Sequence, residues 1–375
     1  MRRVTARFYG EVGRKVYRVV AYDNLHTEWE EHLNFVVLAP SDEVKLGIAR
    51  LKQSGLHNIH AISGSDIESG DIIIPHPEKN LVFVLYRESD MHHSLFLTNR
   101  CNSHCLMCSQ PPTKNDDSWL ISDAIDIISH IRVSPAVLGL TGGEPVLLGQ
   151  ALRTIIDAIE LLHPTTRIEI LTNGRLLKDE NLVQMLTYEL KSSVSWLVPL
   201  YAHADFIHDF VVQAPGAFEE TIAGLLNLQQ RQQPIQLRIV LIDPVLKILP
   251  ELCQFIGRNL PFVNVVALMA CEPIGFALAN QEQCAVDLAD WEAQLRKSAQ
   301  TLDRHDIPFV LMNAPLCALP SKLWPRARRS ISDWKNVYAD ECNGCSVKEK
   351  CSGLFAWHER GWKPTKISAI EETLS

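Results

Sequence analysis

The stretch Cys101-Asn-Ser-His-Cys105-Leu-Met-Cys108 places three cysteines at the spacing C-x3-C-x2-C, directly after the apolar run at residues 95–97. Three thiolates cannot complete a four-iron cluster, because such clusters usually take four cysteines, one for each iron. A loop that supplies three leaves one iron open to a ligand that is not protein. An open metal position is typical of a catalytic rather than a structural site. A zinc site with His104 as the fourth ligand is the alternative at this point.

From residue 93 onward, short apolar runs alternate with helical patterns, which predicts a parallel sheet covered by helices. The apolar runs lie at residues 95–97, 137–140, 168–171, 194–200, 235–242 and 263–269. The helical patterns lie at residues 122–131, 151–162, 178–190, 218–230 and 245–259, with Ser122 as the expected N-cap of the first. In parallel βα folds the reactive groups gather at the C-terminal strand ends. The cysteine loop follows the first of these runs.

Gly142-Gly143-Glu144-Pro145 follows the second apolar run. A glycine pair lets backbone approach closely because no Cβ stands in the way. Glu144 either supplies a charge-assisted acceptor or orders the loop. This segment lies one strand later in the chain than the C-x3-C-x2-C loop. The two motifs agree in indicating one site.

The two motifs together resemble those of the radical S-adenosylmethionine (SAM) superfamily. In that superfamily the amino and carboxylate groups of SAM chelate the open iron of a [4Fe–4S] cluster. The reduced cluster cleaves SAM to a 5′-deoxyadenosyl radical, which abstracts hydrogen from a substrate. The resemblance implies Cys101, Cys105 and Cys108 as cluster ligands, and a partial (β/α)6 TIM-like barrel as the fold.

The resemblance also implies a set of residues that contact SAM. The segment 142–145 is expected near the SAM amino group, and Met107 against adenine, although simple core packing also explains a methionine there. Thr172 and Asn173 follow the third run and either reach the SAM ribose or carboxylate or form a turn built on Asn-Gly. Arg238 lies in the fifth run, and either an inward or an outward orientation fits its apolar neighbours.

Cys317, Cys342, Cys345 and Cys351 form a second group at the spacing C-x24-C-x2-C-x5-C. Four thiolates can close a metal site completely. A structural zinc ribbon usually takes two C-x2-C pairs, which this spacing does not supply. The group resembles the shortened SPASM or "twitch" extensions of radical SAM peptide modifiers, and this implies an auxiliary [4Fe–4S] cluster, with zinc as the alternative.

The residues around the first cysteine group indicate one family within this superfamily. The sequence from Leu97 to Pro112, with its Cys-Ser-Gln-Pro-Pro exit, is similar to that of the His-Xaa-Ser system radical SAM maturases, specifically the C-type partner. The similarity extends through residues 141–148 and 269–276 into the terminal cysteines. It implies a precursor peptide rich in His-Xaa-Ser repeats as substrate, a second radical SAM maturase as partner, and an electron donor such as flavodoxin or ferredoxin.

Composition bounds the remaining possibilities. The chain of 375 residues carries a formal net charge of −8. This charge argues against nucleic-acid binding as its main function. Clustered cysteines without a signal sequence or a membrane-length apolar run predict a cytoplasmic protein. Radical SAM chemistry on a small molecule or on tRNA, and a zinc-stabilised binding protein without enzymatic activity, stay open as alternatives.

Short alternating segments before residue 92 predict a small β-rich N-terminal domain with one helix near residues 41–54. The expected domains are therefore residues 1–92 for this region, 93–304 for the barrel, and 305–375 for the auxiliary cluster region.

Overall fold

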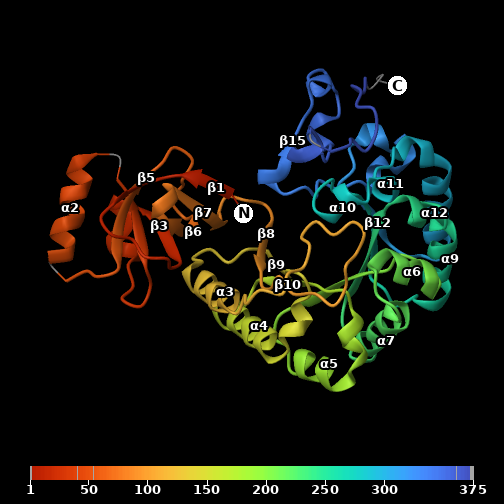
Figure 1. Ribbon diagram of the computed structural model, residues 1–375, viewed down its shortest axis with the longest axis horizontal. Coiled ribbons are helices and arrows are strands. Elements are labelled where there is room, and N and C mark those ends of the chain that lie inside the picture. The colour runs from red at the N-terminus through yellow and green to blue at the C-terminus, as the bar shows by residue number, and fades with distance from the viewer. Residues whose placement is uncertain (1, 40, 54, 360, 372–375) are drawn as a thin grey trace. The chain divides into compact units, whose positions relative to one another are not determined.

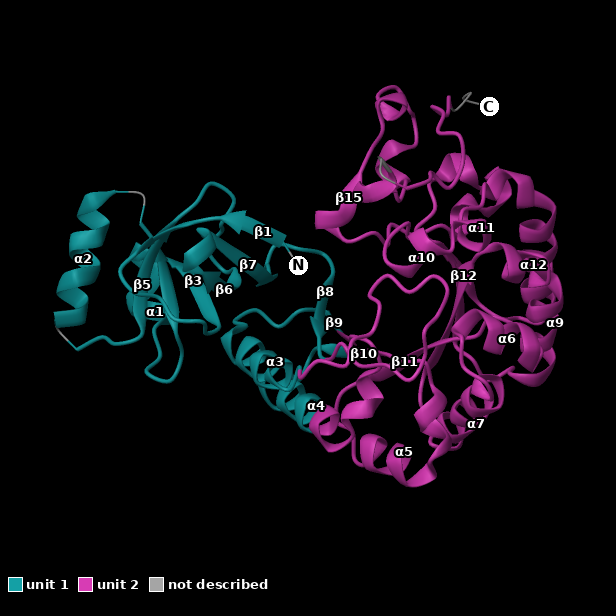
Figure 2. Cartoon of the chain, viewed as in Figure 1, with its two compact units in different colours: residues 1–97, 117–139, 154–167 teal, residues 98–116, 140–153, 168–375 magenta. Residues whose placement is uncertain are grey.

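The structure, a computed structural model, describes residues 2–39, 41–53, 55–359 and 361–371. The chain forms two compact units (Figure 2). Unit 1 comprises residues 1–97, 117–139 and 154–167, and unit 2 comprises residues 98–116, 140–153 and 168–375. The three expected domains remain a prediction. The expected helix near residues 41–54 is α2 (Asp42–Gln53), and Ser54 lies outside the described residues.

The N-terminal region of unit 1 is a mixed sheet of seven strands, in the order β1-β7-β6-β3-β4-β5-β2. The strands are β1 (Arg2–Thr5), β2 (Arg7–Tyr9), β3 (Tyr17–Ala21), β4 (Phe35–Leu38), β5 (Ile59–Ser63), β6 (Ile72–His76) and β7 (Leu81–Tyr86). β1 and β2 stand at opposite edges of the sheet, yet only Ala6 separates them in the chain. Because one residue advances the chain by less than about 4 Å, the two edges meet and the sheet closes on itself.

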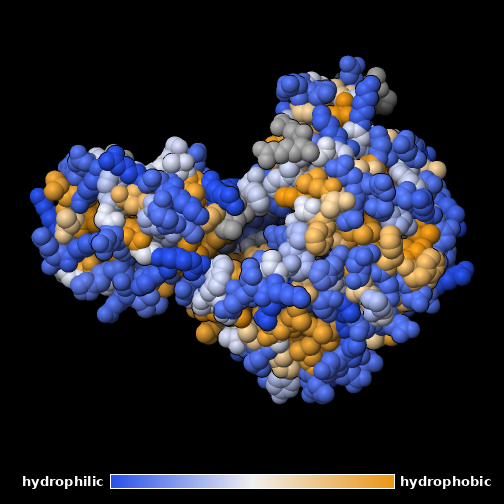
Figure 3. All heavy atoms as spheres, viewed as in Figure 1, coloured by the Kyte–Doolittle hydropathy of each residue, from blue (hydrophilic) through white to orange (hydrophobic). Residues whose placement is uncertain are grey.

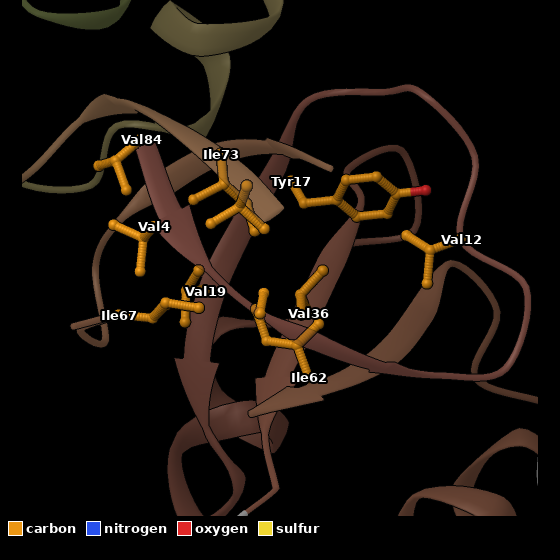
Figure 4. Packing of buried hydrophobic residues seen from close by; sticks show 11 residues of the cluster. Val4, Val12, Tyr17, Val19, Val36, Ile62, Ile67, Ile73 and Val84 are labelled. Atoms are coloured by element: carbon orange, nitrogen blue, oxygen red, sulfur yellow. The ribbon is translucent and has the colours of Figure 1, made fainter. Parts of the chain in front are cut away.

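The closed sheet explains the two apolar clusters of this region. Alternate strand residues point inward and fill the interior, as Figure 4 shows for Tyr17, Val19, Val36 and Ile62. The residues between them point outward and pack under short helices. This outer cluster contains Val20, Leu25, Leu33, Phe35, Val37, Ala39, Ile48, Ile59 and Ala61. The predicted β-rich N-terminal region is therefore confirmed as a sheet with two buried faces.

Unit 1 also contains α3 (Trp119–His130), which begins before the expected residue 122. Ser122 is not the N-cap: it lies inside the helix, where its Oγ donates to the carbonyl oxygen of Trp119 at 2.9 Å. The helix contacts the N-terminal sheet, since the backbone N–H of Asn34 donates to Nε2 of His130 at 3.2 Å.

The second sheet has seven strands in the order β14-β13-β12-β11-β10-β9-β8. They are β8 (His93–Phe96), β9 (Val137–Thr141), β10 (Arg167–Leu171), β11 (Val194–Pro199), β12 (Ile235–Leu241), β13 (Val265–Ala270) and β14 (Phe309–Met312). Neighbouring strands from β10 to β14 pair in parallel. The six expected strands are confirmed within a few residues, but the expected count of six was wrong, because β14 adds a seventh.

Helices follow most strands and lie along the outer side of the sheet (Figure 1). They are α4 (Gln150–Leu162), α5 (Glu180–Thr187), α6 (Asp205–Val212), α7 (Ala217–Gln230), α8 (Asp243–Leu246), α9 (Leu249–Asn259), α10 (Phe276–Ala279), α11 (Gln281–Cys284) and α12 (Glu292–Arg304). The expected helix at residues 245–259 is divided into α8 and α9, and α6 was not expected. Within the described ranges no helix is both long enough and apolar enough to cross a membrane.

The chain after β14 has little regular structure. It contains short 3-10 turns and one antiparallel pair, β15 (Asn336–Val337) with β16 (Leu354–Phe355). This is the region that carries the second cysteine group. On the face shown in Figure 3, apolar atoms form several patches on unit 2, and exposed side chains of this unit include Phe206 and Phe210 of α6.

Candidate metal centres and cofactor site

The first cysteine loop leaves the sheet at the C-terminal end of β8, and its three thiols lie near one another. Burial raises the pKa of the Cys105 thiol, and it raises the pKa of the Cys101 thiol to about 11. The neighbouring thiols of the loop also raise both pKa values. Thiols with such pKa values are protonated at neutral pH unless a positive charge such as a metal replaces the proton. The loop therefore gathers three soft donors of the kind that iron–sulfur clusters and zinc take.

Backbone hydrogen bonds hold this loop from several sides. The N–H groups of His104 and Leu106 donate to the last carbonyls of α6, at Val212 (3.0 Å) and Val211 (2.9 Å). The carbonyl oxygen of Cys108 accepts from the N–H of Phe276 at 2.8 Å. These bonds fix the loop without using the cysteine side chains.

The glycine pair of the 142–145 segment packs against the backbone that leads into the cysteine loop. Gly143 N–H donates to the Thr98 carbonyl oxygen at 2.7 Å, and Glu144 N–H donates to that of Arg100 at 2.8 Å. A Cβ on Gly142 would stand 2.5 Å from the Thr98 carbonyl oxygen, and one on Gly143 would stand 2.2 Å from that of Arg100. Both distances are far below van der Waals contact, so the close approach requires glycine here.

Glu144 is fully buried and orders this end of the sheet. Its Oε1 accepts from Thr172 Oγ1 (2.6 Å) and from the N–H of Val146 (2.9 Å), and its Oε2 accepts from the N–H of Asn173 (2.6 Å). Burial raises the pKa of the Glu144 carboxyl, while these donors act against the rise. The carboxylate thus joins the loop after β9 to the loop after β10. Pro145 is buried and begins the 3-10 helix that follows.

Thr172 and Asn173 form the turn that an Asn-Gly pair favours. Gly174 has a φ of +79°, in the left-handed region, and Asn173 Oδ1 accepts from the N–H of Arg175 at 3.1 Å. The Asn173 amide also points to the cysteine loop, where Nδ2 donates to Asn102 Oδ1 at 2.5 Å and lies 3.8 Å from Cys101 Sγ. The structure therefore brings Asn173 to the cysteines, and its contact with SAM remains a prediction.

Three further residues lie on the same side as the cysteine loop. Met107 is buried. Tyr201 follows β11, and burial together with the nearby Cys105 and Cys108 thiols raises its pKa, while Arg238 acts in the opposite direction. Arg238 is thus close to Tyr201, and its Nε donates to Met269 Sδ at 3.2 Å.

The second cysteine group surrounds one pocket in the C-terminal part of unit 2. Cys317, Cys342, Cys345 and Cys351 all line it, together with apolar side chains such as Leu316. The chain therefore brings a lone cysteine and a C-x2-C-x5-C segment together across 25 residues of sequence, from position 317 to position 342.

Backbone N–H groups already point at two of these sulfurs. Cys351 Sγ accepts from the N–H of Leu316 (3.3 Å) and of Gly353 (3.4 Å), and Cys345 Sγ accepts from that of Ile370 (3.5 Å). Hydrogen bonds of this kind stabilise thiolates and tune the clusters that they bind. The four-thiol donor set fits an iron–sulfur cluster or zinc. The described residues include no group of three or more His, Cys, Asp or Glu side chains close enough for a single metal ion.

The pairing of Arg175 with Glu220 was not expected from the sequence, whereas His208 and Asp209 follow each other in the chain and suggest a pair that organises a loop. Arg175 and Glu220 form an ion pair at 2.7 Å beside the cysteine loop. His208 accepts from the N–H of Tyr201 at 3.3 Å, and burial lowers its pKa to about 4, so the imidazole is neutral at pH 7. Asp209 accepts from the backbone N–H groups of Gly216 and Phe218, at the start of α7. The Arg175–Glu220 pair has no local sequence signal, because its two residues lie 45 positions apart on different elements.

Comparison with known proteins finds similar solved structures and a matching family model. Among solved structures, Streptococcus suis SuiB bound to S-adenosylmethionine aligns at 13% identity with a TM-score of 0.49, covering 72% of this chain and 55% of SuiB. anSMEcpe with bound AdoMet and Cp18Cys peptide aligns at 13% identity (TM-score 0.45; 58% of this chain, 62% of the other). A radical SAM methyltransferase from Sphaerobacter thermophilus aligns at 15% (TM-score 0.43; 66% and 74%).

This chain thus spans little more than half the length of SuiB. No curated protein matches it. Residues 95–254 match the family model of the radical SAM superfamily, and that range contains the cysteine triad, the 142–145 segment and the turn at residues 172–174. This segment is therefore a radical SAM domain, and the protein is a radical SAM enzyme.

Proposed function

We propose that this protein cleaves SAM reductively and abstracts hydrogen from a ribosomally made precursor peptide. The observation that carries the proposal is the cysteine loop, which lies within the matched segment and is held against the Gly142–Gly143 backbone. Cys101, Cys105 and Cys108 hold the [4Fe–4S] cluster. When bound and reduced, the cluster supplies the electron that cleaves SAM to methionine and a 5′-deoxyadenosyl radical.

The protein's own residues shape the site around the cluster. The glycine pair brings the loop after β9 against residues 98–100, so that backbone from this loop lines the cofactor site. Glu144 holds the loops after β9 and β10 together through three hydrogen bonds. In this proposal Met107 packs on the adenine of SAM, and Thr172 and Asn173 face its ribose or carboxylate.

The second cysteine group holds an auxiliary [4Fe–4S] cluster in this proposal. Support comes from the shared pocket of Cys317, Cys342, Cys345 and Cys351 and from the N–H groups directed at the Cys345 and Cys351 sulfurs. A cluster held by these cysteines would bind the peptide or supply an electron acceptor for it after hydrogen abstraction. Replacing Cys345 and Cys351 with alanine is expected to spare SAM cleavage and to abolish peptide modification. Modification that survives in this variant contradicts the role.

The substrate class rests on the sequence around the first cysteine group. The Cys-Ser-Gln-Pro-Pro exit of the loop is similar to that of the His-Xaa-Ser system maturases, so the proposed substrate is a precursor with His-Xaa-Ser repeats. A second radical SAM maturase and a flavodoxin or ferredoxin complete the proposed system.

The test combines two products of one anaerobic reaction. The reconstituted protein is incubated with SAM, dithionite and a synthetic His-Xaa-Ser precursor, with and without the second maturase. 5′-Deoxyadenosine and a mass change in the precursor are both expected, and both should be lost in Cys105→Ala. SAM cleavage with an unchanged precursor under all conditions contradicts the substrate class, and favours a small molecule or tRNA instead.

A further inference from the structure

We infer that Arg175 is a positioning residue for the cysteine loop: a charged clamp, held by Glu220, that fixes residues 102–103 and so presents Cys101 and Cys105 to the cluster. The inference rests on the proposed function for the identity of the metal, but not for the clamp itself. Arg175 begins the 3-10 helix η4 (Arg175–Lys178) after β10, outside both cysteine motifs.

The guanidinium of Arg175 makes contacts in two directions. Its Nη1 donates to the Asn102 carbonyl oxygen and to Ser103 Oγ, the latter at 3.1 Å. Its Nε donates to Glu220 Oε2 at 2.7 Å. The Arg175 side chain is only 13% exposed, so solvent screens these bonds weakly. Because the guanidinium is planar and rigid, fixing one edge on Glu220 fixes the direction of the other.

The anchor of this clamp is itself firmly placed. Glu220 lies on α7, and α7 packs directly on the segment 174–178. A Cβ on Gly224 of α7 would stand 2.3 Å from the Gly174 carbonyl oxygen, so the approach is as close as backbone allows. Asn227 Nδ2 donates to the carbonyl oxygens of Leu177 (2.9 Å) and Lys178 (3.0 Å). The position of the cysteine loop therefore depends, through Arg175 and Glu220, on the position of α7.

The two residues that Arg175 contacts lie between the first two cysteines. Ser103 is 2% exposed, so its bond to Arg175 is internal to the fold. A loop that is held before the metal arrives loses less conformational entropy when the cluster forms. The fixed positive charge of Arg175 also stands at residues 102 and 103, which adjoin Cys101 in the chain. A cation beside an iron–sulfur cluster stabilises the reduced state more than the oxidised one, because reduction adds negative charge.

The experiment compares Arg175→Met, Arg175→Lys and Glu220→Gln in the full-length protein. Lys178→Met is the matched control, because Lys178 shares Glu220 at 2.6 Å and is 52% exposed. All are made in the Cys345→Ala, Cys351→Ala background, so that the iron signal reports the triad. Hydrogen exchange at the His104 and Leu106 amides measures loop order before and after reconstitution. Iron content and the midpoint potential of the cluster are measured afterwards.

Arg175→Met is expected to exchange at least tenfold faster at these amides, to take up at most half the iron, and to have a lower midpoint potential. Arg175→Lys should keep the midpoint potential closer to the parent value, because lysine keeps the positive charge. Its amides should still exchange somewhat faster than in the parent, because lysine lacks the planar guanidinium that binds two partners. Glu220→Gln should be intermediate, and Lys178→Met unchanged.

If the His104 and Leu106 amides of Arg175→Met exchange within twofold of the parent rate, Arg175 is not a positioning residue for the loop. If the midpoint potential is unchanged, the electrostatic effect of Arg175 on the cluster is contradicted. A parent protein that takes up no iron overturns the proposed function instead. In that case the exchange rates of the metal-free protein still decide whether Arg175 orders the loop.

Discussion

Replacing Glu144 with glutamine tests how much the buried carboxylate contributes to the site. Glutamine keeps one acceptor oxygen, which can still serve Thr172 Oγ1 and the N–H of Val146, both now on Oε1. Its amide nitrogen then takes the place of Oε2 and faces the N–H of Asn173, donor against donor. The variant loses one charge-assisted hydrogen bond and leaves a buried donor unpaired, which costs about 2–4 kcal/mol.

The free energy of unfolding from urea titration measures this loss. Glu219→Gln is the control, because Glu219 is exposed on α7, and a surface change of this kind usually alters stability by less than about 0.5 kcal/mol. The reasoning is refuted if Glu144→Gln unfolds within about 0.5 kcal/mol of the parent protein. That result would mean that the hydrogen bond from the Asn173 N–H contributes no net stability at this strand end.

Two further substitutions test the supports of the cysteine loop and of the loop after α6. Gly143→Ala places a Cβ 2.2 Å from the Arg100 carbonyl oxygen; the forced backbone shift should destabilise the protein by about 1–3 kcal/mol, and wild-type stability in urea would argue against a required glycine. Asp209→Ala removes the acceptor of the N–H groups of Gly216 (2.6 Å) and Phe218 (2.8 Å); hydrogen exchange at these two amides should accelerate at least tenfold, and unchanged rates would show that other groups order the loop.

The sheet region was largely predictable because its signals are local. Each apolar run is short and is ended by polar or glycine-rich sequence, so the six expected strands fall within a few residues of β8 to β13. β14 was missed because Phe309–Met312 is a four-residue run after a strongly polar helix. α6 was missed because Phe206, Phe210, Val211 and their neighbours are apolar on more than one face.

Contacts between distant residues were the part that sequence reasoning did not reach. The closure of the N-terminal sheet depends on β1 and β2 pairing with different partners, which no local pattern reports. The glycine pair was expected to allow a close approach of backbone near SAM. The structure shows that it allows the chain's own backbone at Arg100 to approach closely. The Arg175–Glu220 pair spans 45 residues, so its position beside the cysteine loop follows only from the packing of α7.

Metal analysis of the anaerobically purified protein tests the central claim most directly. With two four-iron clusters, we expect about eight irons and eight acid-labile sulfides for each chain. A variant with alanine at Cys101, Cys105 and Cys108 should retain about four of each, held by the second cysteine group. Zinc in place of iron in both proteins would contradict the account.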